Sequence, residues 1–366
     1  MGLPDIVIEF SRKAVTAIQS GALGIVGVIL KDDQNKGAMI LRGIDEIPTG
    51  ESAFSEENTA YLERAFMGSP TKVIVYTLDK EAEDYNDAFK YFASHKVNYL
   101  VGAPDITSAE ATKMVTWVKG IREKSIRRPV IVVPETEGDS RAVINFDIVN
   151  YSEEDKPKAG ETAFTKAQLC SRIAGILAGL DLRVSATYKP LTEMTYIPSA
   201  EDEEVDTAID AGKLVLYSDG ERIVIGRGVN SLTTVDEVNT EDLKKIKISA
   251  IQDLIEEDIY STINSSYIGN YSNSYDNKCL LITAIRGYLR GLEATEGGRG
   301  YLRGGSSSVE INVAKQKLYL ESIGIDTSDM SEQEIKEANT GSHVFLKGTI
   351  SILDAIEDVD IFINKE

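Results

Sequence analysis

The pattern of apolar and polar residues predicts alternating strands and helices over the first half of the chain. Short apolar runs such as VIVYT, YLVGA and VIVVP are separated by stretches in which apolar residues recur at helical spacing. Continuous apolar runs are typical of parallel strands whose sheet is covered by helices on both faces. The expected strands are Gly24–Leu30, Ala38–Arg42, Thr71–Thr77, Val97–Gly102, Pro129–Val133 and Val143–Val149, and the expected helices are Glu56–Phe66, Asp84–Ala93, Ser108–Lys124 and Thr165–Leu180.

A hairpin is predicted at residues 213–225, where two β-rich runs flank Asp219-Gly220. Glycine adopts positive φ without steric cost, so Asp-Gly between such runs is a strong turn signal. An isolated hairpin is only marginally stable, so this one needs further strands as partners. The pattern then changes to a long helix from Leu243 to Ile263.

Both ends of the chain are apolar, alternating and short, which suits strands that add to the edge of a sheet. They lie at residues 5–10 and 344–363. The hypothesis is that these two arms pair with the hairpin of a neighbouring subunit; pairing within the same chain is the alternative. The residues assigned to these linking strands are Ile6, Ile8, Phe10, Leu214, Leu216, Ile223, Ile225, Phe345, Ile350, Ile352, Ile361 and Ile363.

The remaining chain predicts further helices and two acidic solvent loops, at 152–158 and 199–206. The helices are expected at Val205–Ala211, Lys278–Leu292, Val309–Ile323 and Ser331–Asn339; Ser331 and Glu334 form a capping box. Four parts result: an N-terminal arm at 1–22, an α/β domain at 23–200, an α+β assembly domain at 201–342 and a C-terminal arm at 343–366.

Two segments carry a resemblance to a known family. GRGVNSLTT follows the hairpin, and SSYIGNYSNSYDNKCLLITAIRGYLRGL follows the long helix. With the two arms, they resemble the C-terminal half of contractile tail sheath proteins of phages, defective phages and R-type bacteriocins.

The resemblance implies a non-catalytic, subtilisin-like α/β domain and a structural role without a cofactor. It also implies hexameric rings that stack into a helical polymer around a tail tube, with baseplate and tail terminator proteins as further partners. Such a subunit assembles in the bacterial cytoplasm and then forms part of a virion or bacteriocin tail. A related secretion-system sheath is the nearest alternative.

Composition and motifs speak against several other classes. The chain has 39 Lys and Arg against 59 Asp and Glu, a net charge of −20, which disfavours nucleic-acid binding. A signal peptide is not expected, because Met1–Phe10 lacks a basic start followed by an apolar core. A membrane span is not expected either, because the longest apolar run, Gly21–Leu30, is too short. Cys170 and Cys279 are expected to be reduced core residues in helices, not a disulfide.

An enzyme with a nucleotide or phosphate ligand is the less favoured alternative, because its motifs are missing. There is no G-x-S-x-G, phosphate loop or metal-binding motif. His95 and His343 are interpreted as surface or cap residues, and Gly298, Gly300 and Gly304 as a flexible loop.

Four arginines are concentrated in one region of this acidic chain: Arg286, Arg290, Arg299 and Arg303. They are interpreted either as solvated residues at a helix end or as a contact with an acidic partner. The resemblance implies that this partner is the tail tube.

Overall fold

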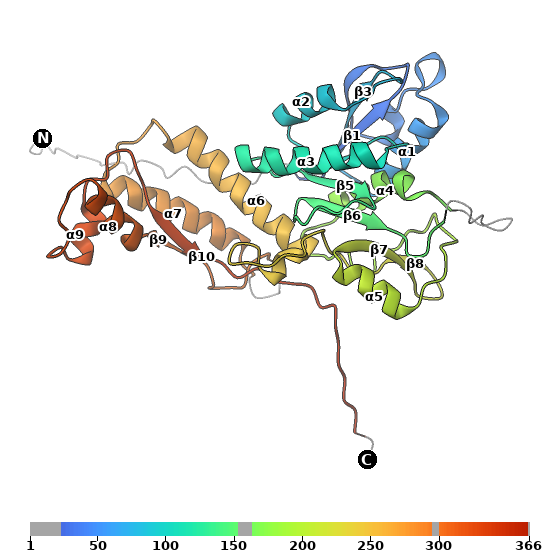
Figure 1. Cartoon of the computed structure of the whole chain (residues 1–366). Coiled ribbons are helices and arrows are strands. Elements are labelled where there is room, and N and C mark those ends of the chain that lie inside the picture. The colour runs from blue at the N-terminus through green and yellow to red at the C-terminus, as the bar shows by residue number, and fades with distance from the viewer. Residues whose placement is uncertain (1–22, 153–162, 295–299, 365–366) are drawn as a thin grey trace, which may run out of the picture. The chain divides into compact units, whose positions relative to one another are not determined.

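The computed structural model describes residues 23–152, 163–294 and 300–364 (Figure 1). These residues form two compact units. The sheet unit consists of 23–257 and 354–364, and the C-terminal unit consists of 258–353. The boundary falls inside one helix, α6 (Ile246–Thr262), so one continuous element belongs to both units.

The sheet unit contains one eight-stranded sheet in the order β2-β3-β1-β4-β5-β6-β7-β8. The pairs from β3 to β7 are parallel, and the outer strands β2 and β8 are antiparallel to their neighbours. The predicted mostly parallel α/β sheet is therefore confirmed. The strands are β1 (Ile25–Lys31), β2 (Gly37–Leu41), β3 (Lys72–Leu78), β4 (Tyr99–Val101), β5 (Val130–Pro134), β6 (Val143–Asp147), β7 (Lys213–Ser218) and β8 (Ile223–Ile225).

Helices cover both faces of this sheet, and the alternation along β1 shows why. Val26 and Val28 pack in one apolar cluster with α1 (Glu56–Phe66) and α4 (Lys166–Gly179). Ile25 and Ile29 point to the other face and pack with α2 (Asn86–Ser94) and α3 (Ser108–Lys124). Successive residues of a strand face opposite sides, so a continuous apolar run fills both layers.

Local sequence signals fix where these helices begin. Thr107 and Glu110 form a reciprocal capping box at α3, and Thr165 and Gln168 form another at α4. Each box satisfies backbone N–H groups that have no partner inside the helix. A further helix, α5 (Asp202–Asp210), precedes β7, and short 3-10 turns occur at Ile44–Glu46, Gly50–Ser52 and Glu241–Lys244.

The structure corrects two predictions, one about the place of the hairpin and one about the boundary between domains. β7 pairs in parallel with β6, so the hairpin extends the α/β sheet instead of opening an assembly domain at residue 201. The compact units meet between Glu257 and Asp258, within α6. The acidic loop at 199–206 suggested a boundary because it is polar, but α5 begins there and packs against β7.

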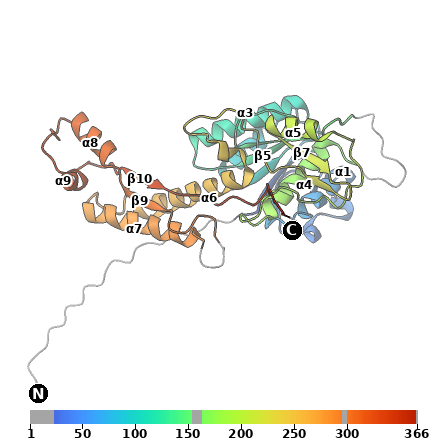
Figure 2. The same cartoon turned by 90° about the horizontal axis from the view of Figure 1, so that it is seen from below.

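The C-terminal unit combines helices with a two-stranded antiparallel sheet of β9 (Ser308–Ile311) and β10 (Leu346–Thr349). β9 lies beside α7 (Tyr275–Leu292) (Figure 2). The helix predicted at Val309–Ile323 begins too early, because Val309 and Ile311 are buried in the β9 strand and Glu310 between them is exposed. The other elements are a π-helical turn at Ile263–Tyr267, α8 (Val313–Ser322) and α9 (Glu332–Glu337), whose capping box by Ser331 and Glu334 is confirmed.

Candidate assembly interface

The hairpin cannot accept an additional strand, because both of its edges have partners in this chain. β7 is bonded to β6, and the outer edge of β8 is bonded to residues 188–191. The N–H of Leu191 donates to the carbonyl of Ile223 at 2.8 Å, and the N–H of Ile225 donates to that of Lys189 at 2.9 Å. The assigned linking residues Leu214, Leu216, Ile223 and Ile225 are all buried in the core of this sheet. The hypothesis that the arms pair with this hairpin is therefore wrong.

The β9–β10 sheet has fewer strand partners than the hairpin. In the described part of the chain, each of its strands pairs only with the other. Lys347 and Glu310 form an ion pair across it at 2.9 Å, and Val309 and Ile311 bury their side chains. A two-stranded sheet of four-residue strands is short of partners, and a backbone edge that no described strand occupies can pair with an extended segment.

The C-terminal segment begins as part of this sheet. Phe345 is half-buried and packs against the ring of Tyr319, and its carbonyl accepts a hydrogen bond from the N–H of Asn312 at 2.8 Å. Ile352 forms an isolated bridge with Leu302, and Ile350 is exposed. The first half of the predicted arm thus pairs within its own chain.

Most apolar residues in the rest of the arm are not buried. Ile356 is 90% exposed and Phe362 is 86% exposed. Val359, Ile361 and Ile363 are also mostly exposed, and none of these residues belongs to a strand in the described structure. A cluster of exposed apolar side chains is costly in water and marks a segment that binds elsewhere. The assigned residues Ile6, Ile8 and Phe10 lie outside the described residues.

Three of the four arginines can be placed in the structure. Arg286 and Arg290 lie one turn apart on the exposed side of α7, and Arg303 is exposed in the loop before β9. None of the three forms an ion pair with another residue that the structure describes. Arg299 lies outside the described residues. Whether these side chains contact an acidic partner stays a prediction.

The acidic residue beside them, Glu293, has a structural role. Its carboxylate accepts hydrogen bonds from the N–H groups of Gly305 and Ser307, both at 3.0 Å, and from the Ser307 hydroxyl. The Ser307 hydroxyl and these backbone donors lower the pKa of Glu293. Glu293 therefore holds the loop that carries Arg303.

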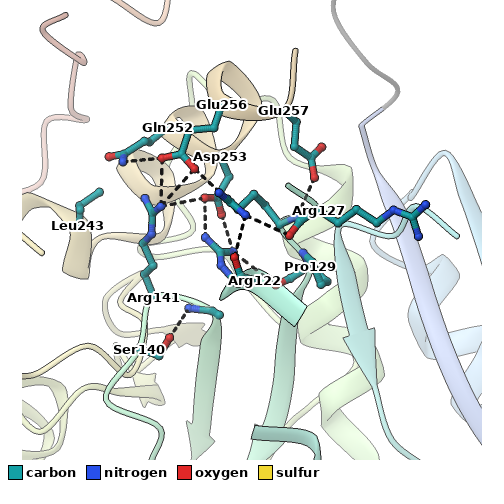
Figure 3. Close-up of polar contacts among 12 residues, drawn as sticks. Arg122, Arg127, Pro129, Ser140, Arg141, Leu243, Gln252, Asp253, Glu256 and Glu257 are labelled. Atoms are coloured by element: carbon teal, nitrogen blue, oxygen red, sulfur yellow. Dashed lines mark hydrogen bonds and ion pairs between the residues drawn. The ribbon is translucent and has the colours of Figure 1, made fainter. Parts of the chain in front are cut away.

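A cluster of buried ion pairs fixes the first half of α6 to the sheet unit (Figure 3). Asp253 on α6 accepts two hydrogen bonds from the Arg122 guanidinium of α3, at 2.6 and 2.8 Å. Arg141, just before β6, lies 3.5 Å from Asp253 and 3.2 Å from Glu256. Bidentate pairs of this kind set orientation as well as energy. No signal in the sequence indicated this cluster.

Further contacts extend this cluster along α6. Arg128 donates from Nε to Glu256 at 2.8 Å and from its backbone N–H to Glu257 at 2.8 Å. Lys96 pairs with Glu257 at 2.7 Å. Although burial alone raises it, hydrogen bonds from Arg128 and Gln252 bring the pKa of Glu256 to about 2.

Asp258, which follows Glu257 on α6, belongs to the C-terminal unit. The Tyr288 hydroxyl on α7 donates to the buried carboxylate of Asp258 at 2.7 Å. Adjacent residues of one helix are therefore held by different units.

The histidines and cysteines that were considered for catalysis do not form a cluster with one another in the described structure. His95 stacks on Tyr91 and is exposed, and His343 stacks on Phe345. Cys170 and Cys279 are both free thiols in helices; Cys170 is buried in the core as predicted, but Cys279 is only half-buried. The described residues contain no group of His, Cys, Asp and Glu arranged to hold a metal ion. Their helices also include none that is long and apolar enough to cross a membrane.

Comparison with known proteins gives consistent results. The family model for the phage tail sheath protein central domain matches residues 79–231. The tail sheath protein of Clostridium phage phiCD119 is 36% identical over 370 residues, covering 98% of each chain.

Solved structures share the fold. The sheath tail protein of Desulfitobacterium hafniense has a TM-score of 0.67 at 15% identity, over 84% of this chain and 94% of its own. The contracted helical sheath of the anti-feeding prophage has a TM-score of 0.69 at 14% identity, over 100% of both chains.

Proposed function

The chain belongs to the phage tail sheath protein family, and we propose that it is the structural subunit of a contractile tail sheath. The observation that carries the proposal is the near full-length match to a tail sheath protein, at 36% identity over 98% of this chain. Its role is mechanical and requires neither catalysis nor a cofactor. The sheet unit corresponds to the domain that the family nomenclature calls subtilisin-like.

Subunits assemble as hexameric rings that stack into a helical polymer around a tail tube. When the baseplate triggers contraction, the rings rotate, slide and expand, and the tube is driven through a target envelope. The likeness in fold to a sheath solved in its contracted state supports this mechanism. Tube, baseplate and terminator proteins are the partners, and the subunit passes from the host cytoplasm into a virion or bacteriocin tail.

Strand exchange keeps the subunits linked during this movement. The β9–β10 sheet supplies backbone edges, and the exposed apolar residues near the C-terminus supply one donor. The N-terminal segment with Ile6, Ile8 and Phe10 is the second donor. These two donor segments and the C-terminal unit together form the part of the subunit that links it to its neighbours. Main-chain hydrogen bonds between strands persist while the connecting segments change direction, so the polymer can expand without losing its links.

The exposed arginines of α7 and the following loop are the proposed contact with the tube. The negative charges spread over the rest of this chain repel those of a second copy. A local basic surface attracts an acidic partner instead.

Electron microscopy of the purified protein tests the proposal. Striated tubes with sixfold end views are expected, and their diameter changes when tube and baseplate proteins are supplied. Discrete small oligomers under all assembly conditions would contradict it. A secretion-system sheath is the second candidate, because the fold alone does not separate it from a phage or bacteriocin sheath; the neighbouring genes and the cell of origin distinguish them.

A further inference from the structure

Three carboxylates near the C-terminus bind side chains of the sheet unit. Asp354 pairs with Lys245, which directly precedes α6, and Asp358 pairs with Arg227, which follows β8. Between them, the side chain of Glu357 is only 6% exposed. The apolar residues of the same segment behave in the opposite way, because Ile356 and residues 359–363 remain exposed.

Glu357 occupies a site that is built for a carboxylate. The hydroxyls of Ser185 and Thr187 donate to its Oε1 at 2.7 and 2.8 Å. The Thr187 N–H donates to the Ser185 hydroxyl oxygen, and the Gly228 N–H donates to the Thr187 hydroxyl oxygen, at 3.1 and 3.0 Å. Both hydroxyl oxygens therefore already accept a backbone N–H. The proton of Thr187 is left for Glu357, and the proton of Ser185 has two acceptors within reach, Glu357 Oε1 at 2.7 Å and Thr187 Oγ1 at 3.0 Å. Hydrogen bonds to an ionised acceptor are stronger than neutral ones.

Two lysines lie near this site, while Asp202 and Asp206 of α5 line the pocket beside Glu357 and Asp358. Lys245 Nζ lies 3.6 Å from Glu357 Oε2, and this oxygen has no hydrogen-bond partner among the residues that the structure describes. Lys247 is buried nearby: its burial lowers its pKa, and the charges of Asp354 and Glu357 oppose that shift. Three cations thus face the three carboxylates of this segment in a chain whose net charge is −20.

We propose that Ser185, Thr187, Arg227 and Lys245 form a receptor for the acidic segment 354–358, and that this receptor holds the root of the C-terminal tail on the sheet unit of the same chain. We call the bound segment the tail latch. The recognised chemistry is a short extended peptide with carboxylates at its first, fourth and fifth positions.

The tail latch explains how residues 354–358 of the tail differ from residues 359–363. Its three anchored carboxylates fix residues 354–358, so the apolar residues 359–363 start from a defined place on the subunit. A donor strand that is anchored at its root loses less conformational freedom when it binds a second copy. This consequence for assembly rests on the proposed sheath function, but the latch itself does not.

Limited proteolysis of the unpolymerised full-length protein tests the latch. Thermolysin cleaves on the amino side of large apolar residues, so it can cut before Ile356 inside the latch and before Phe362 beyond it. Mass spectrometry measures both rates in one sample. Slow cleavage before Ile356 and fast cleavage before Phe362 are expected for the wild type. Equal rates at the two positions would overturn the proposal.

Substitutions in the receptor leave the cleaved sequence unchanged. Lys245→Met and the isosteric Thr187→Val should each speed cleavage before Ile356 about tenfold or more, the effect of losing one charge-assisted contact. Cleavage before Phe362 should not change. The matched control is Lys244→Met, because Lys244 pairs with Glu241 on its own turn and not with the tail. No acceleration in both receptor variants would overturn the proposal.

Protein concentration separates binding within one chain from binding between copies. Protection before Ile356 should be the same across a hundredfold dilution. Protection that disappears on dilution would place the tail on a second copy and overturn the latch within one chain. Because every readout uses unpolymerised protein, the latch can fail while sheath formation stands, and the reverse also holds.

Discussion

The ion-pair cluster under α6 makes a quantitative prediction about Asp253. Its side chain is 8% exposed and Arg122, its bidentate partner, is 10% exposed. Asp253→Asn removes the negative charge but keeps the size of the side chain. It leaves Arg122 without its counter-ion, and it also weakens the environment of Arg141, whose Nη1 already has no hydrogen-bond partner.

The expected cost follows from this burial. Removing one partner of a buried pair destabilises by about 3–5 kcal/mol, because the remaining charge stays desolvated. Asn still offers one hydrogen bond to Arg122, so the lower end, about 3 kcal/mol, is expected. An exposed pair behaves differently: Asp79→Asn, which removes the partner of Lys36, should leave the stability nearly unchanged, because solvent screens this pair.

Urea unfolding of the unpolymerised protein measures both variants. The single tryptophan, Trp117, lies on α3 and stacks on Phe89, so its fluorescence reports on the sheet unit. With a slope of about 3 kcal/mol per molar urea, the midpoint of Asp253→Asn should fall by about 1 M, and that of Asp79→Asn by much less.

A double variant tests whether the pair acts as a unit. In Arg122→Met with Asp253→Leu, no unpaired charge is created at that pair, and Arg141 keeps Glu256. This variant should therefore be more stable than Asp253→Asn alone. A loss below about 1 kcal/mol for Asp253→Asn, or simple additivity of Arg122→Met and Asp253→Leu, would refute the reasoning.

Three further predictions follow from the structure. The pKa of Glu256, about 2, lies below its ordinary value of 4.5, so the contribution of this ionised carboxylate to folding stability is present above about pH 4.5 and is lost as pH falls toward 2. The difference in urea midpoint between wild type and Glu256→Gln should therefore shrink between pH 6 and pH 3.5. A constant difference would contradict the lowered pKa. Changing Arg286, Arg290, Arg299 and Arg303 together to Glu should prevent sheath growth on tubes while tube-free polymerisation survives. One substitution alone should have almost no effect, because exposed charge pairs are worth ~0.2–1 kcal/mol. Sedimentation with tubes measures sheath growth, Arg222→Glu is the control, and normally sheathed tubes from the quadruple variant would exclude the contact. Deleting residues 1–12 should leave the urea midpoint unchanged but abolish polymerisation seen by electron microscopy, whereas a clearly lowered midpoint would mean that this segment completes its own subunit.

The elements that depend on neighbouring residues could be predicted from the sequence. α1 and α3 begin and end where the pattern placed them, because their caps and their apolar spacing lie within a few residues of each other. The buried parallel strands were recognisable because apolar residues fill both faces. Exposed apolar residues near the C-terminus were visible as an alternating segment with no obvious place in a core.

Partners that are distant in the sequence could not be predicted. The hairpin at 213–225 carried a clear turn signal, but only the fold shows that β6 is its neighbour and that residues 188–191 close its other edge. Strand pairing uses backbone groups that every residue carries, so the sequence does not say which strand lies beside which.

The same reason applies to the charged side chains. Arg122 and Asp253 are 131 positions apart, and Glu357 lies 172 positions from Ser185. In the sequence each is one of many similar charges, most of which are solvated. The tertiary structure removed water from these few and brought their counter-ions to hydrogen-bonding distance, and that desolvation decides which charges matter.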